Sequence, residues 1–494
     1  MSEYPSDLFN SSSAGWTAAG GNSQTMDVNA AFADSGFHQV WIMVSGVLIF
    51  PIIPGIGMFY AGEMRRKSAA SMLWLSMGIC AVVPFQWFFW GYSLTYAADA
   101  SPFIGTLTNF GLRNVIAAPV GYLPEMLFCF FQCMFCVETL VIMIGGCFER
   151  CRLVPTMVYA FCWATVVYCP VACWTWNANG WLYTLGALDF AGGGPVHIAS
   201  GTGALAFALV LGRRLDVDEV PRARRLTAHN PTLIYVGTIF IWMGWFGFNG
   251  GSTLNASVRT SYALFNTNLA AATGVMGFGV VEYWLYKGRL TVTGACRGAV
   301  VGLVGITPAA GFVPVYFAAV IGFVAGVIVR ATENIHDWVR IDEGLSVFSH
   351  HAIGGICGAV MTGLFSANWV SRLDGMTEAS GWVDGHFVQL GYQLAEVAAI
   401  VGYTFVVSVV LLYAIDHIPG LKFRVDAETE RDGLDAALLY NEGAGDHELF
   451  VALKEAGFFD VLAIKGRAAV EDSLEAVGLA TLTTSGSAVP VKAD

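Results

Sequence analysis

The chain has 494 residues, of which 55 % are hydrophobic and only 13 % are charged. Soluble proteins carry about 25 % charged residues, so this composition excludes an ordinary soluble domain and indicates a polytopic membrane protein. The net charge of −12 gives no support to nucleic-acid binding.

The first 37 residues are polar and contain no lysine or arginine. They lack the basic start, the short apolar core and the cleavage site of a signal peptide. We therefore expect residues 1–37 to form an extracellular N-terminal segment. Asn10-Ser11-Ser12 matches the N-glycosylation sequon, which an extracellular position permits.

Apolar segments of the length that crosses a bilayer, about 20 residues, follow in close succession. They lie at 39–61, 69–97, 124–147, 153–173, 190–212, 231–252, 262–286, 293–308, 311–331, 347–366 and 389–415, and the eighth is the shortest. Backbone groups cannot stay unpaired in lipid, so we predict an all-α fold with 11 transmembrane helices. The transmembrane domain would occupy residues 38–415 and a cytoplasmic tail residues 416–494.

The basic residues are distributed unequally between the two sides of the predicted membrane domain. Alternate loops and the tail carry 22 of the 25 lysines and arginines, and the opposite side holds only Arg113, Arg259 and Arg372. By the positive-inside rule, the N-terminus is outside and the C-terminus is inside. An odd number of spans requires the same arrangement.

Eleven cysteines lie almost entirely in or beside the apolar segments. This placement predicts small apolar helix residues rather than a disulfide framework. Cys133 and Cys136 form a CxxC pair, but a zinc site needs four ligands and none follow nearby, so we expect no metal site.

Three of the nine histidines fall within the predicted spans, namely His197 in the fifth and His350 and His351 in the tenth. Asp189 and Asp342 precede them at similar distances, and small residues follow both sites. Spans five apart run in opposite directions, so the pattern predicts a 5+5 inverted repeat plus one extra helix, with a site at the midplane. The alternative is two unrelated buried histidines, each bonded to a backbone carbonyl.

Histidine rings inside a membrane should be largely neutral, because a charged imidazolium is costly in hydrocarbon. A neutral imidazole both donates and accepts a hydrogen bond. Two such rings facing each other can therefore take up a proton and pass it on.

Aromatic side chains gather in the same spans. Phe131 and Phe135 are spaced i, i+4 on one face of the third span. Further candidates are Trp176 near the outer end of the fourth span and Trp245, Phe248 and Ser252 along the sixth. Desolvated aromatic faces attract cations by about 2 kcal/mol or more, although each ring taken alone is also explained by helix packing. Carboxylates within spans, here Glu138, Glu282 and Glu396, are functional candidates without an assigned role.

Several motifs in chain order resemble the ammonium transporter family (Amt/Mep/Rh). They are "IPGIGMFYAGEMRRK", "FQCMF", "DFAGGGPVHIASG", "GWFGFNGGS" and "GLVGITPAAG", within about residues 38–440. The stretch from "FNGGS" onward is most similar to the eukaryotic, fungal-type members. The resemblance implies an eleven-span fold with an inverted repeat, a homotrimer, and one hydrophobic pore in each subunit.

The resemblance also assigns roles to residues. Trp176, Phe131 and Ser252 correspond to an outer ammonium-recruitment site, Phe135 and Phe248 to a stacked phenyl gate, His197 and His351 to the twin pore histidines, and Asp189 to a carboxylate that supports the recruitment region. His350 stands where the family usually has an apolar residue, and we expect it to point off the pore axis.

The chain departs from the family pattern at two places. Ser346 replaces an acidic residue common before "VF", so a contact at that helix start should differ. The tail keeps Gly433-Leu434-Asp435 but lacks the usual His-Gly pair, which leaves its regulation open. A cytoplasmic regulator of the tail is not identified by the sequence.

We therefore expect selective ammonium uptake at the plasma membrane, with no cofactor and no enzymatic activity. Ammonium would lose a proton at the gate, pass the histidines as ammonia and regain a proton inside. Methylammonium should pass and potassium should not. A proton that follows along the histidines would make transport electrogenic, whereas a proton left outside would make the protein a gas channel. The alternatives are an ammonium sensor that signals through the tail and a haem protein that uses the histidines as axial ligands.

Overall fold

The computed structural model describes residues 30–147, 149–215, 228–335 and 339–440. The chain divides into two compact units, Met1–Leu434 and Asp435–Asp494. The sequon at Asn10 and residues 441–494 of the predicted tail lie outside the described residues. The helices of the predicted membrane domain all belong to the first unit.

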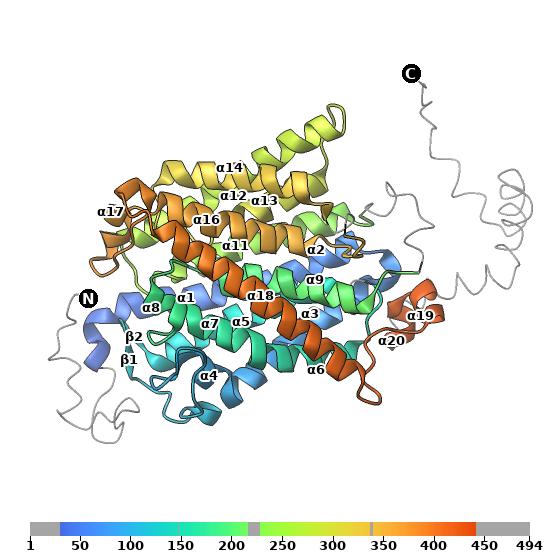
Figure 1. Ribbon diagram of the computed structural model, residues 1–494, viewed down its shortest axis with the longest axis horizontal. Helices are drawn as coiled ribbons and strands as arrows, with labels where there is room; N and C mark the ends of the chain where they lie inside the picture. The colour runs from blue at the N-terminus through green and yellow to red at the C-terminus, as the bar shows by residue number, and fades with distance from the viewer. Residues whose placement is uncertain (1–29, 148, 216–227, 336–338, 441–494) are drawn as a thin grey trace, which may run out of the picture. The chain divides into compact units, whose positions relative to one another are not determined.

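The first five apolar segments are helical, and several are composed of more than one element (Figure 1). The elements are α1 (Gly36–Ile49) and α2 (Ile52–Glu63); α3 (Ala69–Gln86), η3 (Trp87–Gly91) and α4 (Tyr92–Tyr96); α5 (Glu125–Met143) and η5 (Ile144–Cys147); α6 (Leu153–Trp163), η6 (Ala164–Tyr168), α7 (Cys169–Trp176) and α8 (Trp181–Leu185); and η7 (Gly193–Ile198) and α9 (Ala199–Leu211). A two-residue hairpin, β1 (Pro119–Val120) and β2 (Leu123–Pro124), precedes α5.

The remaining six apolar segments are also helical. They are α11 (Pro231–Gly251), α12 (Val258–Leu285), α13 (Val292–Ile306), α14 (Val315–Thr332), η8 (Phe348–Ile353) with α16 (Gly354–Phe365), and α18 (Gln389–Asp416). Short elements are η1 (Ala30–Ser35), η2 (Arg66–Ser68), η4 (Phe110–Leu112), α17 (Asn368–Ser371), η9 (Arg372–Asp374), η10 (Trp382–Asp384), α19 (Ala427–Asp432) and α20 (Leu434–Leu438).

Within the described ranges, nine helices are long and apolar enough to cross a membrane. The segment Phe348–Phe365 makes a tenth if it is taken with the short helix Asn368–Asp374, to which it is bent by 100°. The helix α13 has 15 residues, about 22 Å, and is shorter than a hydrocarbon core of about 30 Å. These helices make the chain an all-α polytopic membrane protein, and the count of 11 spans stays a prediction.

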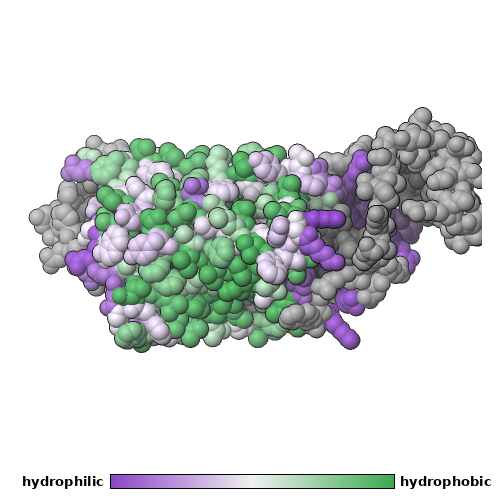
Figure 2. Space-filling view, turned by 90° about the horizontal axis from the view of Figure 1, so that it is seen from above, coloured by the Kyte–Doolittle hydropathy of each residue, from purple (hydrophilic) through white to green (hydrophobic). Residues whose placement is uncertain are grey.

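The long helix α18 has the reverse of the amphipathic pattern of a soluble helix. Its buried face carries Gln393, Glu396 and Ser408, whereas Val406 and Val410 are about 60 % exposed. In Figure 2, apolar residues cover the middle of the visible surface and polar residues gather toward its ends. An apolar exterior over polar buried positions is what a lipid environment requires.

Close backbone contact holds α12, α13 and α14 together. A Cβ added to Gly302 of α13 or to Gly322 of α14 would lie 2.2 Å from the carbonyl oxygen of Ala270 in α12. Glycine at these two positions lets three backbones meet, as small residues do between membrane helices. The 11 cysteines, all within the described residues, are free, as the sequence predicted.

Wide, π-helical turns interrupt the α-helices at four places in the described chain, namely η3, η6, η7 and η8. Two of them open the segments that carry the predicted pore histidines: His197 lies in η7 and His351 in η8. Turns of this kind occur frequently at functional sites. These two turns lie five apolar segments apart, and the inverted repeat stays a prediction.

Candidate functional site

The two candidate pore histidines face each other. Nδ1 of His351 lies 3.3 Å from Nδ1 of His197, and the ring centroids are 5.4 Å apart. Both side chains are buried. One Nδ1 therefore donates and the other accepts, which leaves the Nε2 atoms of the two rings with opposite roles, one as acceptor and one as donor. Nε2 of His197 has no hydrogen-bond partner among the described residues.

Aromatic rings continue from the histidine pair toward the N-terminal end of α5. The rings of Phe135 and Phe248 are stacked with centroids 4.2 Å apart. Phe248 lies 6.3 Å from His197, and the ring of Trp245 stacks on His197 at 5.4 Å. The stacked phenyl pair thus separates the histidines from the next group of side chains.

That next group is the predicted recruitment site. The rings of Phe131 and Trp176 meet Phe135 edge-on at 5.0 and 5.9 Å. Ser252, one turn after Phe248, donates its hydroxyl proton to the Phe248 carbonyl at 2.7 Å. The hydroxyl oxygen keeps its lone pairs, so it can accept a hydrogen bond from a solute. Aromatic faces and an acceptor together suit a small cation that carries N–H groups.

The Asp189 carboxylate binds backbone groups at the start of η7. Its carboxylate accepts hydrogen bonds of 2.7–2.8 Å from the backbone N–H groups of Gly192, Gly193 and Gly194. Gly192 has φ +113°, which L side chains rarely adopt, so the turn that brings these donors together depends on glycine. The Asp189 carbonyl also accepts from Nε1 of Trp176 at 3.2 Å. One residue therefore supports both the histidine turn and the aromatic group at Trp176.

The corresponding support for η8 comes from a residue that the sequence analysis missed. Glu343 accepts from the backbone N–H groups of Val347 and Phe348 at 2.6 and 3.2 Å. Asp342, which the sequence paired with Asp189, instead binds Arg214 at 2.8 and 2.9 Å. The sequence spacing could have identified Glu343, since Asp189 and Glu343 each lie four residues before a backbone N–H group that the carboxylate binds. Ser346, where the sequence predicted a changed contact, has φ +54°.

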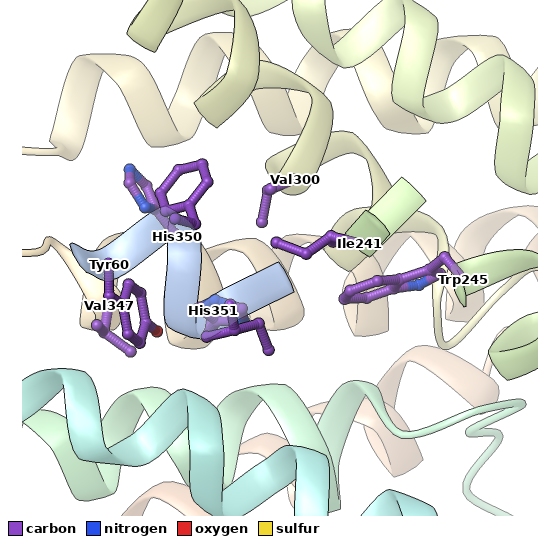
Figure 3. A pocket seen from close by; sticks show the side chains of 9 residues that line it. Tyr60, Ile241, Trp245, Val300, Val347, His350 and His351 are labelled. Carbon is purple, nitrogen blue, oxygen red and sulfur yellow. The ribbon is translucent and has the colours of Figure 1, made fainter. Parts of the chain in front are cut away.

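A mostly apolar pocket adjoins His351, and neither Phe135 nor Phe248 lines it (Figure 3). It is lined by Ile56, Phe59, Tyr60, Ile241, Trp245, Val300, Val347, His350 and His351. Figure 3 shows the rings of His350 and His351 at different places on its wall. Tyr60 donates its hydroxyl proton to the Ile142 carbonyl at 3.0 Å, which fixes its ring at the edge of the pocket.

His350 lines this pocket and is also bonded away from His351. Its Nε2 lies 3.1 Å from Glu333 Oε1, and Glu333 is also paired with Arg297 and Arg330 at 2.8 and 3.0 Å. Burial disfavours the charged carboxylate, but Arg297, His350 and Arg330 outweigh it and lower the pKa of Glu333 to about 2. The ionised carboxylate accepts, so Nε2 of His350 carries the proton.

Buried ion pairs join the loops at the end of the helices nearest this pocket. Glu149 accepts from Nε of Arg65 at 2.6 Å and pairs with Arg214 at 3.0 Å. The chain after α18 is anchored to the same loops, since Arg424 donates to the carbonyl of Leu211 at 2.8 Å and pairs with Glu430 at 2.9 Å. The first part of the predicted tail, up to Leu434, thus belongs to the same compact unit as the helices.

Known proteins are similar to this chain in sequence and fold. A sequence model described as the Ammonium Transporter Family matches residues 40–444. Ammonium transporter MEP2 of Saccharomyces cerevisiae is 46 % identical over 427 residues, 85 % of each chain, and Ammonium transporter 1 of Schizosaccharomyces pombe is 45 % identical over 421 residues, 84 % of this chain and 83 % of that one. The crystal structure of Candida albicans Mep2 superposes with a TM-score of 0.80 at 46 % identity, covering 83 % of this chain and 90 % of that one.

Proposed function

The chain belongs to the ammonium transporter family, and on that premise we propose that it takes up ammonium selectively across the plasma membrane. Its relatives are transporters rather than enzymes. The observation that carries the proposal is the paired arrangement of His197 and His351 beside the stacked rings of Phe135 and Phe248. A solute moving along this line meets aromatic faces first, a ring stack next and two hydrogen-bonding rings last.

Recruitment occurs at Trp176, Phe131 and Ser252. Ammonium has a pKa near that of an alkylamine, about 10, so it arrives charged. Cation–π contacts contribute about 2 kcal/mol each in a desolvated site, and the Ser252 oxygen accepts one N–H bond. Potassium is attracted by the same rings but offers no N–H group and no proton to release.

Deprotonation follows at the phenyl gate. An isolated ion in an apolar interior costs tens of kcal/mol by Born arguments, far more than the outer contacts return. Ammonia is neutral and avoids this cost. It passes Phe135 and Phe248, is hydrogen-bonded by the histidine pair and is reprotonated on the other side, while the proton is relayed along His197 and His351.

Architecture and orientation are part of the same proposal. We place the N-terminus outside and the C-terminus inside, with 11 spans in a 5+5 inverted repeat plus one helix, and three copies in a homotrimer. The charge asymmetry of the loops and the resemblance to the family support this arrangement. A membrane-impermeant label should reach an N-terminal tag on intact cells, and labelling of a C-terminal tag instead would contradict it.

The sensor alternative depends on residues 441–494, which lie outside the described part of the chain, and no observation on the described residues favours it over transport. The test of transport is uptake of labelled methylammonium by cells that lack their own ammonium transporters. We expect uptake that ammonium suppresses and that equimolar potassium leaves unchanged. Equal suppression by both cations would contradict selective recruitment and deprotonation.

A further inference from the structure

Among the three glutamates in the predicted spans, Glu138 differs from the other two in its surroundings. Glu282 accepts from the Thr291 hydroxyl at 2.8 Å, and Glu396 accepts from Gln393 at 3.0 Å. Both carboxyl oxygens of Glu138 lack a hydrogen-bond partner among the described residues, and its side chain is fully buried. A buried polar group without a partner costs about 1–3 kcal/mol and calls for an explanation.

The helix geometry of α5 gives the direction of Glu138. Residues of an α-helix follow one another at about 100°, so Phe131, Phe135, Glu138 and Ile142 fall within an arc of about 60°. Glu138 lies about 4.5 Å along the axis from Phe135, on the same face. Long side chains in helices point back toward the preceding turn, which directs the carboxyl group toward the level of Phe135.

Residues on both sides of Glu138 along this face contact the transport path. Phe135, one turn before, stacks on Phe248 at 4.2 Å. The carbonyl of Ile142, one turn after, accepts a hydrogen bond from Tyr60, which lines the pocket below the histidines. Glu138 therefore lies at a depth between the phenyl gate and that pocket, on the stripe of α5 that faces them.

The chemistry of a carboxyl group at this depth follows from the cost of charge. An isolated carboxylate and an isolated ammonium are each expensive in an apolar site, whereas carboxylic acid and ammonia are both neutral. The partnerless carboxyl group of Glu138 therefore rests as the neutral acid, which offers an oxygen lone pair and an O–H group to its neighbours. A partnerless carboxyl group on the gate side of the histidines is thus suited to receive the proton that ammonium must lose.

We propose that Glu138 is a third proton-exchanging group of the path, and this inference rests on the proposed ammonium transport. As ammonium reaches the gate, one N–H bond breaks and an O–H bond forms at the carbonyl oxygen of Glu138, while the O–H bond at its other oxygen breaks. Ammonia enters the pore and the carboxyl group stays neutral. The released proton passes to Nε2 of His197, which has no partner among the described residues and carries a lone pair in the tautomer whose Nδ1 donates to His351. The neutral carboxyl group is then ready to exchange a proton with the next ammonium.

Infrared difference spectroscopy on the purified, membrane-reconstituted protein tests this protonation directly. Exchanging potassium chloride for ammonium chloride should change the carbonyl band of a buried carboxylic acid in the wild type. Glu138→Gln should abolish that change, and Glu138→Asp should shift it but retain it. The control Glu282→Gln, at the buried carboxyl bonded to Thr291, should leave it unaltered.

Ammonium-evoked current in the same proteoliposomes provides the second measurement, with the fold of each variant checked by size-exclusion chromatography. We expect Glu138→Gln to lower the current at least tenfold and Glu138→Asp to restore part of it. A Glu138→Gln protein that keeps the ammonium-dependent band or the wild-type current would overturn the inference and leave the proposed function intact. A wild type that neither binds nor moves ammonium would instead overturn the proposed function.

Discussion

At the scale of single residues, the contact between two Nδ1 atoms determines which hydrogen bonds the histidine pair can offer to a solute. Because His197 and His351 share one hydrogen bond at 3.3 Å, their Nε2 atoms are left as one acceptor and one donor. A neutral molecule with both a lone pair and N–H groups, such as ammonia, matches this pair. A metal cation matches only the acceptor.

Ser252 is expected to act on binding more than on turnover. Hydrogen bonds to charged groups contribute about 1.5–3 kcal/mol, so Ser252→Ala should raise the KM for methylammonium roughly tenfold while the maximal rate changes little. Initial uptake rates over a concentration series measure both quantities. Ser252→Thr keeps the hydroxyl and should stay near the wild type; an unchanged KM in Ser252→Ala would remove Ser252 from the recruitment site.

At the scale of elements, the two histidine turns are each held by a buried acidic residue. Asp189 binds three N–H groups at the start of η7, and Glu343 binds two at the start of η8. These carboxylates replace the backbone acceptors that the first turn of a helix lacks. The position of each histidine ring therefore depends on a carboxylate that binds the backbone of the turn rather than the ring itself.

Asp189→Asn and Glu343→Gln should each weaken the protein and its transport together. An amide has one oxygen acceptor in place of two, so we expect a loss of about 2 kcal/mol and a fall of several degrees in the unfolding temperature. Thermal unfolding in detergent and methylammonium uptake measure the two effects. Asp99→Asn, at an exposed carboxylate bonded to Thr106 and Thr108, is the control and should change neither.

The loop anchor at Asp342 predicts a dependence of stability on pH. Burial alone would raise the pKa of Asp342, but the hydrogen bonds and charge of Arg214 outweigh it and hold the pKa below its usual range. The stabilisation is therefore complete above the unfolded-state pKa of about 3.9 and is lost as the pH falls toward the folded-state pKa.

Comparison of Asp342→Asn with the wild type isolates this contribution. The variant should unfold at a lower temperature at pH 7, and the difference should shrink steadily below about pH 4. Differential scanning fluorimetry in detergent across this range gives the measurement. A difference that stays constant down to pH 3 would mean that the ion pair with Arg214 does not stabilise the folded protein.

At the scale of the whole molecule, hydropathy and charge predicted most of the fold, because lipid imposes a simple rule on each span. A helix lies over all 11 predicted apolar segments, and the ends agree within a few residues except at the C-terminal end of the fourth. The π-helical turns were not predicted, since their wide geometry has no compositional signal. Pairing Asp342 with Asp189 was wrong, because the choice between Asp342 and Glu343 depends on which carboxylate Arg214 binds across the fold.

The sequence predicted most of the candidate site residues that the structure brings together, but not every contact that they make. The structure brings together His197, His351, Phe135, Phe248, Phe131 and Trp176 through the ring contacts and the histidine hydrogen bond. Ser252 adjoins them through Phe248. For His350 the sequence predicted only a direction off the pore axis. Its bond to Glu333 was not predicted, because the bond joins two helices whose relative rotation only the fold determines.

The central claim is that the histidine pair carries the proton while ammonia crosses the apolar pore. Ammonium-evoked current in proteoliposomes tests it most directly, with the wild type beside the double variant His197→Ala/His351→Ala and internal pH recorded in parallel. The account predicts a wild-type current that vanishes or loses its selectivity against potassium in the double variant. A selective current of wild-type size in the folded double variant would contradict it, as would ammonia flux without any current in the wild type.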